Sequence, residues 1–227
     1  MFLACSWQKV KDPVQIRIMT QLMERIYAGK GRSKRAIEGM SEFVRAFLAF
    51  EIEDESIKKN IIDIQTRATE TGADLKLVEP ENVHMTVRFL GDITLNTAEK
   101  VFVEMQKVQF KPFPIQLAGL GVFPGLNNPR VLWAGITQGA EQLQNVASQI
   151  EPKLQGLGFP PERNPFSPHL TVARVRSARN KLQLADLVMK NADYDFGSIE
   201  ARCLRLKRSE LTPRGPIYST LKEYCPK

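Results

Sequence analysis

The sequence predicts an α+β fold in which mixed or antiparallel sheets form two lobes. Strand-like and helix-like segments alternate from Ser41 onward. They fall into two similar halves, and each half contains one histidine on an expected strand. The GxGxxG and GxxxxGK[ST] patterns of nucleotide-binding parallel sheets do not occur. These three observations favour α+β over a doubly wound fold.

The first half predicts three strands and two helices, and its last strand is 113–123. FVRAFLAFEI (43–52) mixes aromatic and aliphatic residues in partial alternation, which indicates a strand. Residues 54–71 begin with acidic residues and repeat isoleucine at helical spacing, and Gly72 ends this expected helix. NVHMTVRFL (82–90) is typical of a strand that a Gly-Asp turn ends. Apolar residues three or four apart predict a second amphipathic helix over 95–108.

The second half repeats these patterns. Its first strand, 130–137, is joined to the last strand of the first half by PGLNNP, whose glycine, asparagines and prolines are typical of a hairpin or loop. FSPHLTVARV carries the second histidine on a strand, and two further strands close the chain. From the last strand of the first half onward, the expected order is strand 113–123, strand 130–137, helix 139–156, strand 166–175, helix 180–190, strand 196–207 and strand 217–223.

The 227 residues are enough for one domain or two small lobes. The net charge of +7 lies mostly in residues 1–40, where eight Lys/Arg face three Asp/Glu. We expect this segment to be a basic extension, a helix followed by a flexible linker at 29–35, and residues 41–227 to form the domain proper. A basic extension is only weak support for RNA binding, since many solvated tails are basic.

The cysteines and the apolar segments indicate in which cellular compartment the protein is expected. Cys5, Cys203 and Cys225 are odd in number, far apart and without a CxxC pair, so we expect neither a disulfide framework nor a zinc site. No apolar run is long enough to span a bilayer, and the N-terminus lacks the pattern of a signal peptide. We therefore expect a cytoplasmic protein that does not enter membranes, and, without heptads, a monomer.

Both histidines of the chain stand in the same pattern, histidine, apolar residue, threonine, valine. The two copies are HMTV at 84–87 and HLTV at 169–172. Threonine makes up 11 of 227 residues, so threonine two positions after both histidines has a chance of roughly 0.2%. A lone histidine on a strand is more often a buried core residue. The repeated pattern makes that interpretation a poor one here.

Strand geometry explains the spacing. Residues i and i+2 of a strand share a face, so each histidine and its threonine point one way and the apolar residues point into the core. Two such strands side by side would gather two imidazoles and two hydroxyls around one cleft. One imidazole can remove a proton from a nucleophile while the other protonates a leaving oxygen, which suits displacement at phosphorus. No dense carboxylate cluster accompanies the motifs, so we expect neither a metal nor another cofactor.

The two motifs resemble the paired H-x-T-x motifs of the 2H phosphoesterase superfamily. The flanking text, including ENVHMTVRFLGD, GVFPGLNNPRVLWAGI and LKRSELTPRGPIY, is similar to its RNA 2′,3′-cyclic phosphodiesterase branch, also called 2′-5′ RNA ligase. The likeness covers about 41–224. It implies a bilobal fold of two pseudo-symmetric lobes, with mainly antiparallel sheets flanked by helices and the active cleft between the lobes. It also implies RNA with a 2′,3′-cyclic phosphate end as the partner, hydrolysis to a 2′-phosphomonoester, and a possible reverse 2′-5′ ligation.

The resemblance also assigns roles that the nearly symmetric sequence cannot. His84 would donate the proton to the leaving 3′-oxygen and His169 would accept one from water. Thr86 and Thr171 would hold the phosphate. Arg174, five residues after His169, would contact the phosphate, although strand parity requires a bulge to turn it inward.

Three further residues are candidates for binding substrate. Arg88, four residues after His84, lies on the histidine face by parity, with a salt bridge as an equally good interpretation. Phe89 could stack on a base, although an aromatic residue on a strand is more often part of the core. Arg130 is a candidate for contacts with the RNA backbone.

Two other functions remain open from the sequence. The same chemistry could act on a small cyclic nucleotide or a 2′,5′-linked oligonucleotide, which equal turnover of a mononucleotide and an RNA end would indicate. The chain could also be a non-catalytic module that binds RNA ends. Two complete H-x-T-x motifs speak against such a module, because binding alone does not need a matched acid and base.

Overall fold

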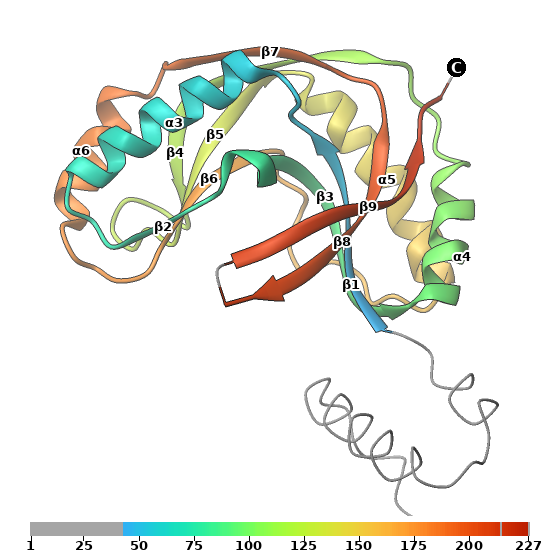
Figure 1. Cartoon of the computed structure of the whole chain (residues 1–227). Coiled ribbons are helices and arrows are strands. Elements are labelled where there is room, and N and C mark those ends of the chain that lie inside the picture. Colours follow the sequence, from blue (N-terminus) through green and yellow to red (C-terminus); the bar gives the residue numbers. More distant parts are fainter. Residues whose placement is uncertain (1–42, 214, 227) are drawn as a thin grey trace, which may run out of the picture. The chain divides into compact units, whose positions relative to one another are not determined.

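Two antiparallel sheets and four α-helices make up the part of the chain that the structure describes, residues 43–213 and 215–226 of a computed structural model (Figure 1). The α+β class and the antiparallel sheets predicted from the sequence are confirmed. The basic extension predicted for residues 1–40 lies outside the described residues. The elements are β1 (Phe43–Glu51), α3 (Glu55–Glu70), β2 (Leu75–Leu77), the 3₁₀ turn η2 (Pro80–Asn82), β3 (His84–Thr94), α4 (Leu95–Met105), β4 (Phe113–Phe123), β5 (Val131–Gln138), α5 (Ala140–Gly156), β6 (Leu170–Val175), α6 (Lys181–Lys190), β7 (Asp195–Ala201), β8 (Leu204–Thr212) and β9 (Gly215–Tyr224).

Each sheet holds one histidine strand. The four-stranded sheet has the order β3-β1-β8-β9, and the five-stranded sheet has the order β2-β6-β5-β4-β7. His84 begins β3, the edge strand of the first sheet, and His169 immediately precedes β6 of the second. The two strands lie against each other where the sheets meet. The topology therefore brings together two motifs that are 85 positions apart in the sequence.

The two lobes are not the two consecutive halves of the chain that the sequence suggested. The four-stranded sheet takes two strands from each end of the domain, and the strands between them form most of the other sheet. Helix α3 follows β1 of the first sheet but packs on β6 and β7 of the second, whereas α4 and α5 pack on β3. Apolar spacing shows which face of an element is buried, but it does not show which sheet covers that face.

The predicted strand 196–207 is two strands. β7 ends at Ala201 in the five-stranded sheet and β8 begins at Leu204 in the four-stranded sheet, because the chain crosses between the sheets here. The sequence pattern is apolar on both sides of this crossing and does not mark it. The short strand β2 was also missed, since three residues are too few to show a period.

Helix α3 forms as the sequence predicts. Asp54 caps it, and its carboxylate accepts hydrogen bonds from the backbone N–H groups of Ser56 (2.8 Å) and Ile57 (3.1 Å). Gly72, with φ of +72°, follows its end in the left-handed conformation that favours glycine. None of the described helices is long and apolar enough to cross a bilayer.

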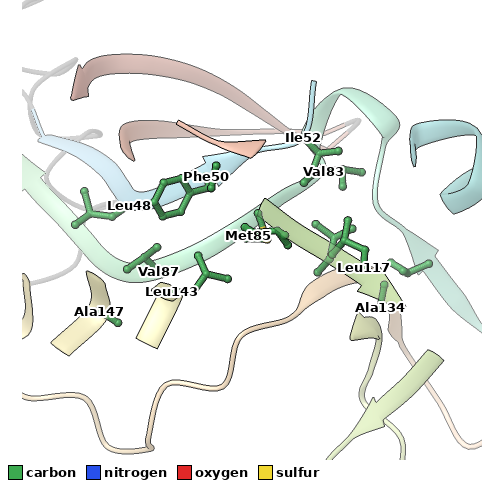
Figure 2. Close-up of a cluster of buried hydrophobic side chains, with 14 of the residues drawn as sticks. Leu48, Phe50, Ile52, Val83, Met85, Val87, Leu117, Ala134, Leu143 and Ala147 are labelled. Carbon is green, nitrogen blue, oxygen red and sulfur yellow. The ribbon is translucent and has the colours of Figure 1, made fainter. Parts of the chain in front are cut away.

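The apolar residues of the histidine strands belong to one continuous core. Met85 and Val87 alternate with His84 and Thr86 along β3, and both are buried. Figure 2 draws them in one buried cluster with residues of the five-stranded sheet and of α5, namely Leu117, Ala134, Leu143 and Ala147. The core therefore fixes which face of β3 carries the histidine.

The expectation that the cysteines form no disulfide is wrong. Cys203 and Cys225 are joined by a disulfide. Cys203 immediately precedes β8 and Cys225 immediately follows β9, and the neighbouring pair Leu204 and Tyr224 is in register across the hairpin. The sequence does not reveal this pairing, because the cysteines are 22 positions apart and only the antiparallel register of β8 and β9 brings them together. Cys5 lies outside the described residues.

Replacing Cys203 and Cys225 together by serine should lower the free energy of unfolding by about 2–4 kcal/mol, because a cross-link of this loop length constrains the unfolded chain. Urea denaturation of the oxidised protein and of the double variant measures the difference. The wild type in reducing agent is the matched control and should unfold like the variant. Equal midpoints for the variant and the oxidised wild type would contradict the cross-link.

Candidate active site

The imidazole of His84 is held by the 3₁₀ turn η2 that precedes its strand and by two aromatic rings. Its Nδ1 lies 2.7 Å from the backbone oxygen of Asn82. A carbonyl oxygen can only accept, so Nδ1 carries the hydrogen and donates it. Phe47 packs on the ring at 4.7 Å between centroids, and Tyr218 meets it edge-on at 5.2 Å. The ring is thereby fixed with Nε2 as its reactive nitrogen.

His169 repeats this arrangement in the other sheet. Its Nδ1 lies 2.7 Å from the backbone oxygen of Ser167, again two residues before the histidine. Phe123 meets its ring edge-on at 5.0 Å between centroids. Both histidines therefore hold the same tautomer, and each can accept or donate a proton through Nε2.

Each histidine strand contains one extra residue three positions after its histidine. Along β3 the register passes from Ala49 opposite Thr86 to Leu48 opposite Arg88, so Val87 is the extra residue. Along β6 it passes from Trp133 opposite Thr171 to Leu132 opposite Ala173, so Val172 is the extra residue. A bulge of this kind shifts the strand alternation by one position. The residue five positions after each histidine then shares its face.

The bulge in β6 gives Arg174 the orientation that its expected role requires. Arg174 is exposed, whereas its neighbours Ala173 and Val175 are buried. Burial raises the pKa of Tyr218, and the charges of Arg174 and Arg45 oppose that rise. The charge of Arg174, on the five-stranded sheet, thus acts on the tyrosine whose ring packs on His84 of the four-stranded sheet.

Arg88 does not lie on the histidine face, so its expected role in binding substrate is corrected. It is only 8% exposed, because the bulge at Val87 turns it into the protein. Its Nε donates to Glu151 at 2.9 Å, and its other nitrogens bond Glu162 and the backbone oxygen of Pro160. Arg88 thus ties β3 to α5 and to the segment that follows α5.

Phe89 takes the position that parity had given to Arg88. It is 58% exposed, and its ring centroid lies 6.2 Å from that of Phe47, which packs on His84. Arg130 is exposed and immediately precedes β5, next to Val131, the cross-strand partner of Arg174. Contact of Phe89 or Arg130 with a substrate stays a prediction.

The sequence did not predict the pair of aromatic rings beside His169, Phe123 and Trp133. Trp133 lies opposite Thr171 on the neighbouring strand, and its ring lies 5.0 Å from that of Phe123. The ring lies directly on β4 at Gly121, where a Cβ atom would come within 2.2 Å of it. Gly121 is the cross-strand partner of Trp133, and a glycine opposite a tryptophan could have predicted this contact. The sequence alone does not show that the two residues are opposite each other.

A buried ion pair beside His84 was also missed. Lys207 of β8 bonds Glu51 of β1, the cross-strand partner of His84. Burial lowers the pKa of His84, and the charge of Lys207 lowers it further. The bond to the Asn82 carbonyl and the charge of Glu51 act in the opposite direction.

Two imidazoles that each leave Nε2 free of the backbone, each two residues before a threonine on its strand, are suited to acid–base chemistry at phosphorus. The comparison with protein families agrees with this class. The model of the LigT-like phosphoesterases matches residues 52–133 and 135–218, and the chain belongs to this family.

Relatives of known name and structure support the same family. The chain is 42% identical over 153 residues to the RNA 2′,3′-cyclic phosphodiesterase of Aeropyrum pernix, covering 67% of this chain and 87% of the relative. It is 40% identical over 181 residues to that of Methanocaldococcus jannaschii, covering 80% of this chain and 100% of the relative. Two crystal structures share the fold.

The Thermus thermophilus protein TT0787 has a TM-score of 0.66 at 26% identity, covering 80% of this chain and 97% of that one. E. coli LigT with 3′-AMP has a TM-score of 0.68 at 22% identity, covering 81% and 98%.

Arg88→Met and Arg174→Met should separate structure from chemistry. Arg88→Met leaves two carboxylates without their cation and should cost about 2 kcal/mol of stability, since those carboxylates still reach solvent. The folded Arg88 variant should keep its activity, whereas Arg174→Met should fold normally and lose activity. Thermal unfolding and turnover of both variants provide the test. A stable but inactive Arg88→Met variant would indicate that Arg88 does bind substrate.

Proposed function

We propose that this protein hydrolyses RNA ends that carry a 2′,3′-cyclic phosphate to 2′-phosphomonoesters. The observation that carries the proposal is the pair of H-x-T-x strands, in which each histidine donates Nδ1–H to the carbonyl two residues before it. Several relatives named RNA 2′,3′-cyclic phosphodiesterase are about 40% identical over most of the domain. A substrate with one phosphorus between an attacking water and a leaving sugar oxygen suits two such groups.

In the proposed reaction His169 Nε2 takes a proton from water while the water oxygen attacks phosphorus. The bond from phosphorus to the 3′-oxygen breaks, and protonated His84 gives its Nε2 proton to that oxygen. The product keeps the phosphate on the 2′-oxygen. The donor and acceptor roles follow the family resemblance. After each turnover His84 regains a proton from solvent and His169 loses one.

The lowered pKa of His84 fits a proton donor in a specific way. A less basic imidazole is a stronger acid once it is protonated, but fewer free molecules hold the proton at neutral pH. A bound phosphodiester brings a negative charge close to the ring and favours its protonated form. Substrate binding would therefore favour protonation of His84, the proton donor of the proposed reaction.

The neighbouring residues have corresponding proposed roles. The hydroxyls of Thr86 and Thr171 would donate to the two non-bridging oxygens, and Arg174 would balance the charge that grows there. Phe89 would stack on a base, and Arg130 would contact the RNA backbone further from the phosphorus. None of these steps uses a metal, because the two histidines supply both proton transfers.

Partner, assembly and compartment form the remaining part of the proposal. We expect RNA as the partner, a monomer as the working form and the cytoplasm as the location. The cytoplasmic location was expected partly because no disulfide was expected. The disulfide of Cys203 and Cys225 takes that support away. The reverse 2′-5′ ligation stays a prediction.

The purified protein in EDTA should convert an oligoribonucleotide ending in 2′,3′-cyclic phosphate to the 2′-phosphate, and not to the 3′-phosphate. His84→Ala and His169→Ala should each lower the rate by about 10²–10⁴-fold while remaining folded, because each removes one proton carrier. Product position is read by chromatography against synthetic standards.

Each other outcome points to another function. Equal turnover of the oligomer and of a cyclic mononucleotide would indicate a small-molecule enzyme. RNA binding without turnover between about pH 5 and 8, the range in which paired imidazoles should work, would indicate a binding module and overturn the proposal.

A further inference from the structure

We propose that the buried ion pair of Glu51 and Lys207 sets the proton affinity of His84, with Lys207 acting as a positioning residue that does not touch the substrate. The inference rests on the proposed function only where it explains why His84 should be a strong acid. The arrangement of the charges themselves does not depend on the substrate.

The sheet register brings the pair to His84. Glu51 is the cross-strand partner of His84 between β1 and β3. Lys207 lies one strand further away, opposite Phe47, and the Phe47 ring packs on the imidazole. The Lys207 ammonium group bonds the Glu51 carboxylate, so it lies beside the side chain of the residue that is opposite His84 in the sheet.

Lys207 is bound too firmly to reach a ligand. It is 6% exposed, and its Nζ bonds Glu51 and donates to Thr220 Oγ1 at 3.0 Å. An ammonium group buried to this extent is rare unless it is paired, because removing a charge from water is costly. A fixed cation with no access to solvent acts on its neighbours through its field.

Glu51 is shared between two cations and is therefore not a free partner for His84. Its other oxygen bonds Arg205, which also pairs with Glu53 at 2.6 Å and with Glu223. Lys207 and Arg205 together lower the pKa of Glu51 and keep it ionised, although burial acts against them. With its charge balanced in this way, Glu51 raises the proton affinity of His84 less than a lone carboxylate would.

The charged and titratable groups around His84, the ion pair included, come from each strand near it. They are Glu51 and Arg45 on β1, Lys207 and Arg205 on β8, Tyr218 on β9, and His169 and Arg174 on or beside β6. Of these charges, that of Lys207 lowers the pKa of His84 and that of Glu51 raises it. Removing either one should therefore move the titration of His84, and the two removals should move it oppositely.

The two histidines allow this to be measured directly, because the whole chain contains only two. NMR of the ring C–H groups against pH gives one titration curve for each, and His169→Gln assigns them. Lys207→Met should raise the midpoint of His84 toward the value of about 6.5 of histidine in a peptide. Glu51→Gln should lower it. Lys207→Arg, which keeps the charge, should stay near the wild type.

His169 serves as the control within each molecule and should move much less. Lys222→Met is the matched control variant, since Lys222 lies on neighbouring β9 but pairs with Glu99 of α4 at 2.9 Å. It should leave both curves unchanged. In the proposed reaction the alkaline limb of kcat/KM should follow the His84 midpoint upward in Lys207→Met.

An unchanged His84 midpoint in folded Lys207→Met, or equal shifts of both histidines, would overturn the inference. Should Lys207→Met not fold, Glu51→Gln decides, because a midpoint that does not fall contradicts the inference by itself. The NMR titration needs no substrate, so failure of the proposed function would appear as absent turnover with the His84 shifts intact.

Discussion

The site depends on one constraint of the backbone, the single extra residue that follows each H-x-T motif. Without Val87 and Val172, the strand alternation would place buried and exposed residues on the wrong faces beyond the threonines. With them, Phe89 and Arg174 reach the histidine faces, while the positions before them join the interior. The same local feature thus exposes an aromatic ring after one motif and a cation after the other.

The two halves are alike in backbone and different in electrostatics. Each histidine donates Nδ1–H to a carbonyl two residues earlier, so both present the same nitrogen. The ring of His84, however, packs on both Phe47 and Tyr218, which also contact each other, and lies beside the ion pair of Glu51 and Lys207, and its pKa is lowered. A nearly symmetric motif can in this way place one of its two imidazoles in an environment that lowers the pKa of that imidazole. The difference comes from residues of β1, β8 and β9 that lie far from the motifs in the sequence.

The sequence was sufficient wherever a feature depends on neighbours along the chain. Alternation within HMTV and HLTV predicts the faces of both histidines, and helical spacing predicts α3 within a residue or two. It was insufficient wherever a feature depends on the partner strand. Arg88 was placed by parity and is instead buried, the disulfide needs the β8–β9 register, and the pair of Glu51 and Lys207 needs the sheet order. The bulge in β6 was anticipated only because the family resemblance required Arg174 to turn inward.

In the proposed reaction both Nε2 atoms act at one phosphate group. A crystal structure of the complex with a 2′-phosphate nucleotide, the product of that reaction, would show whether they do. We expect phosphate oxygens at about 3 Å from Nε2 of His84 and of His169, with Thr86 and Thr171 donating to the same phosphate. A phosphate bound by only one histidine, or an imidazole turned so that Nδ1 contacts the ligand, would rule out a shared site.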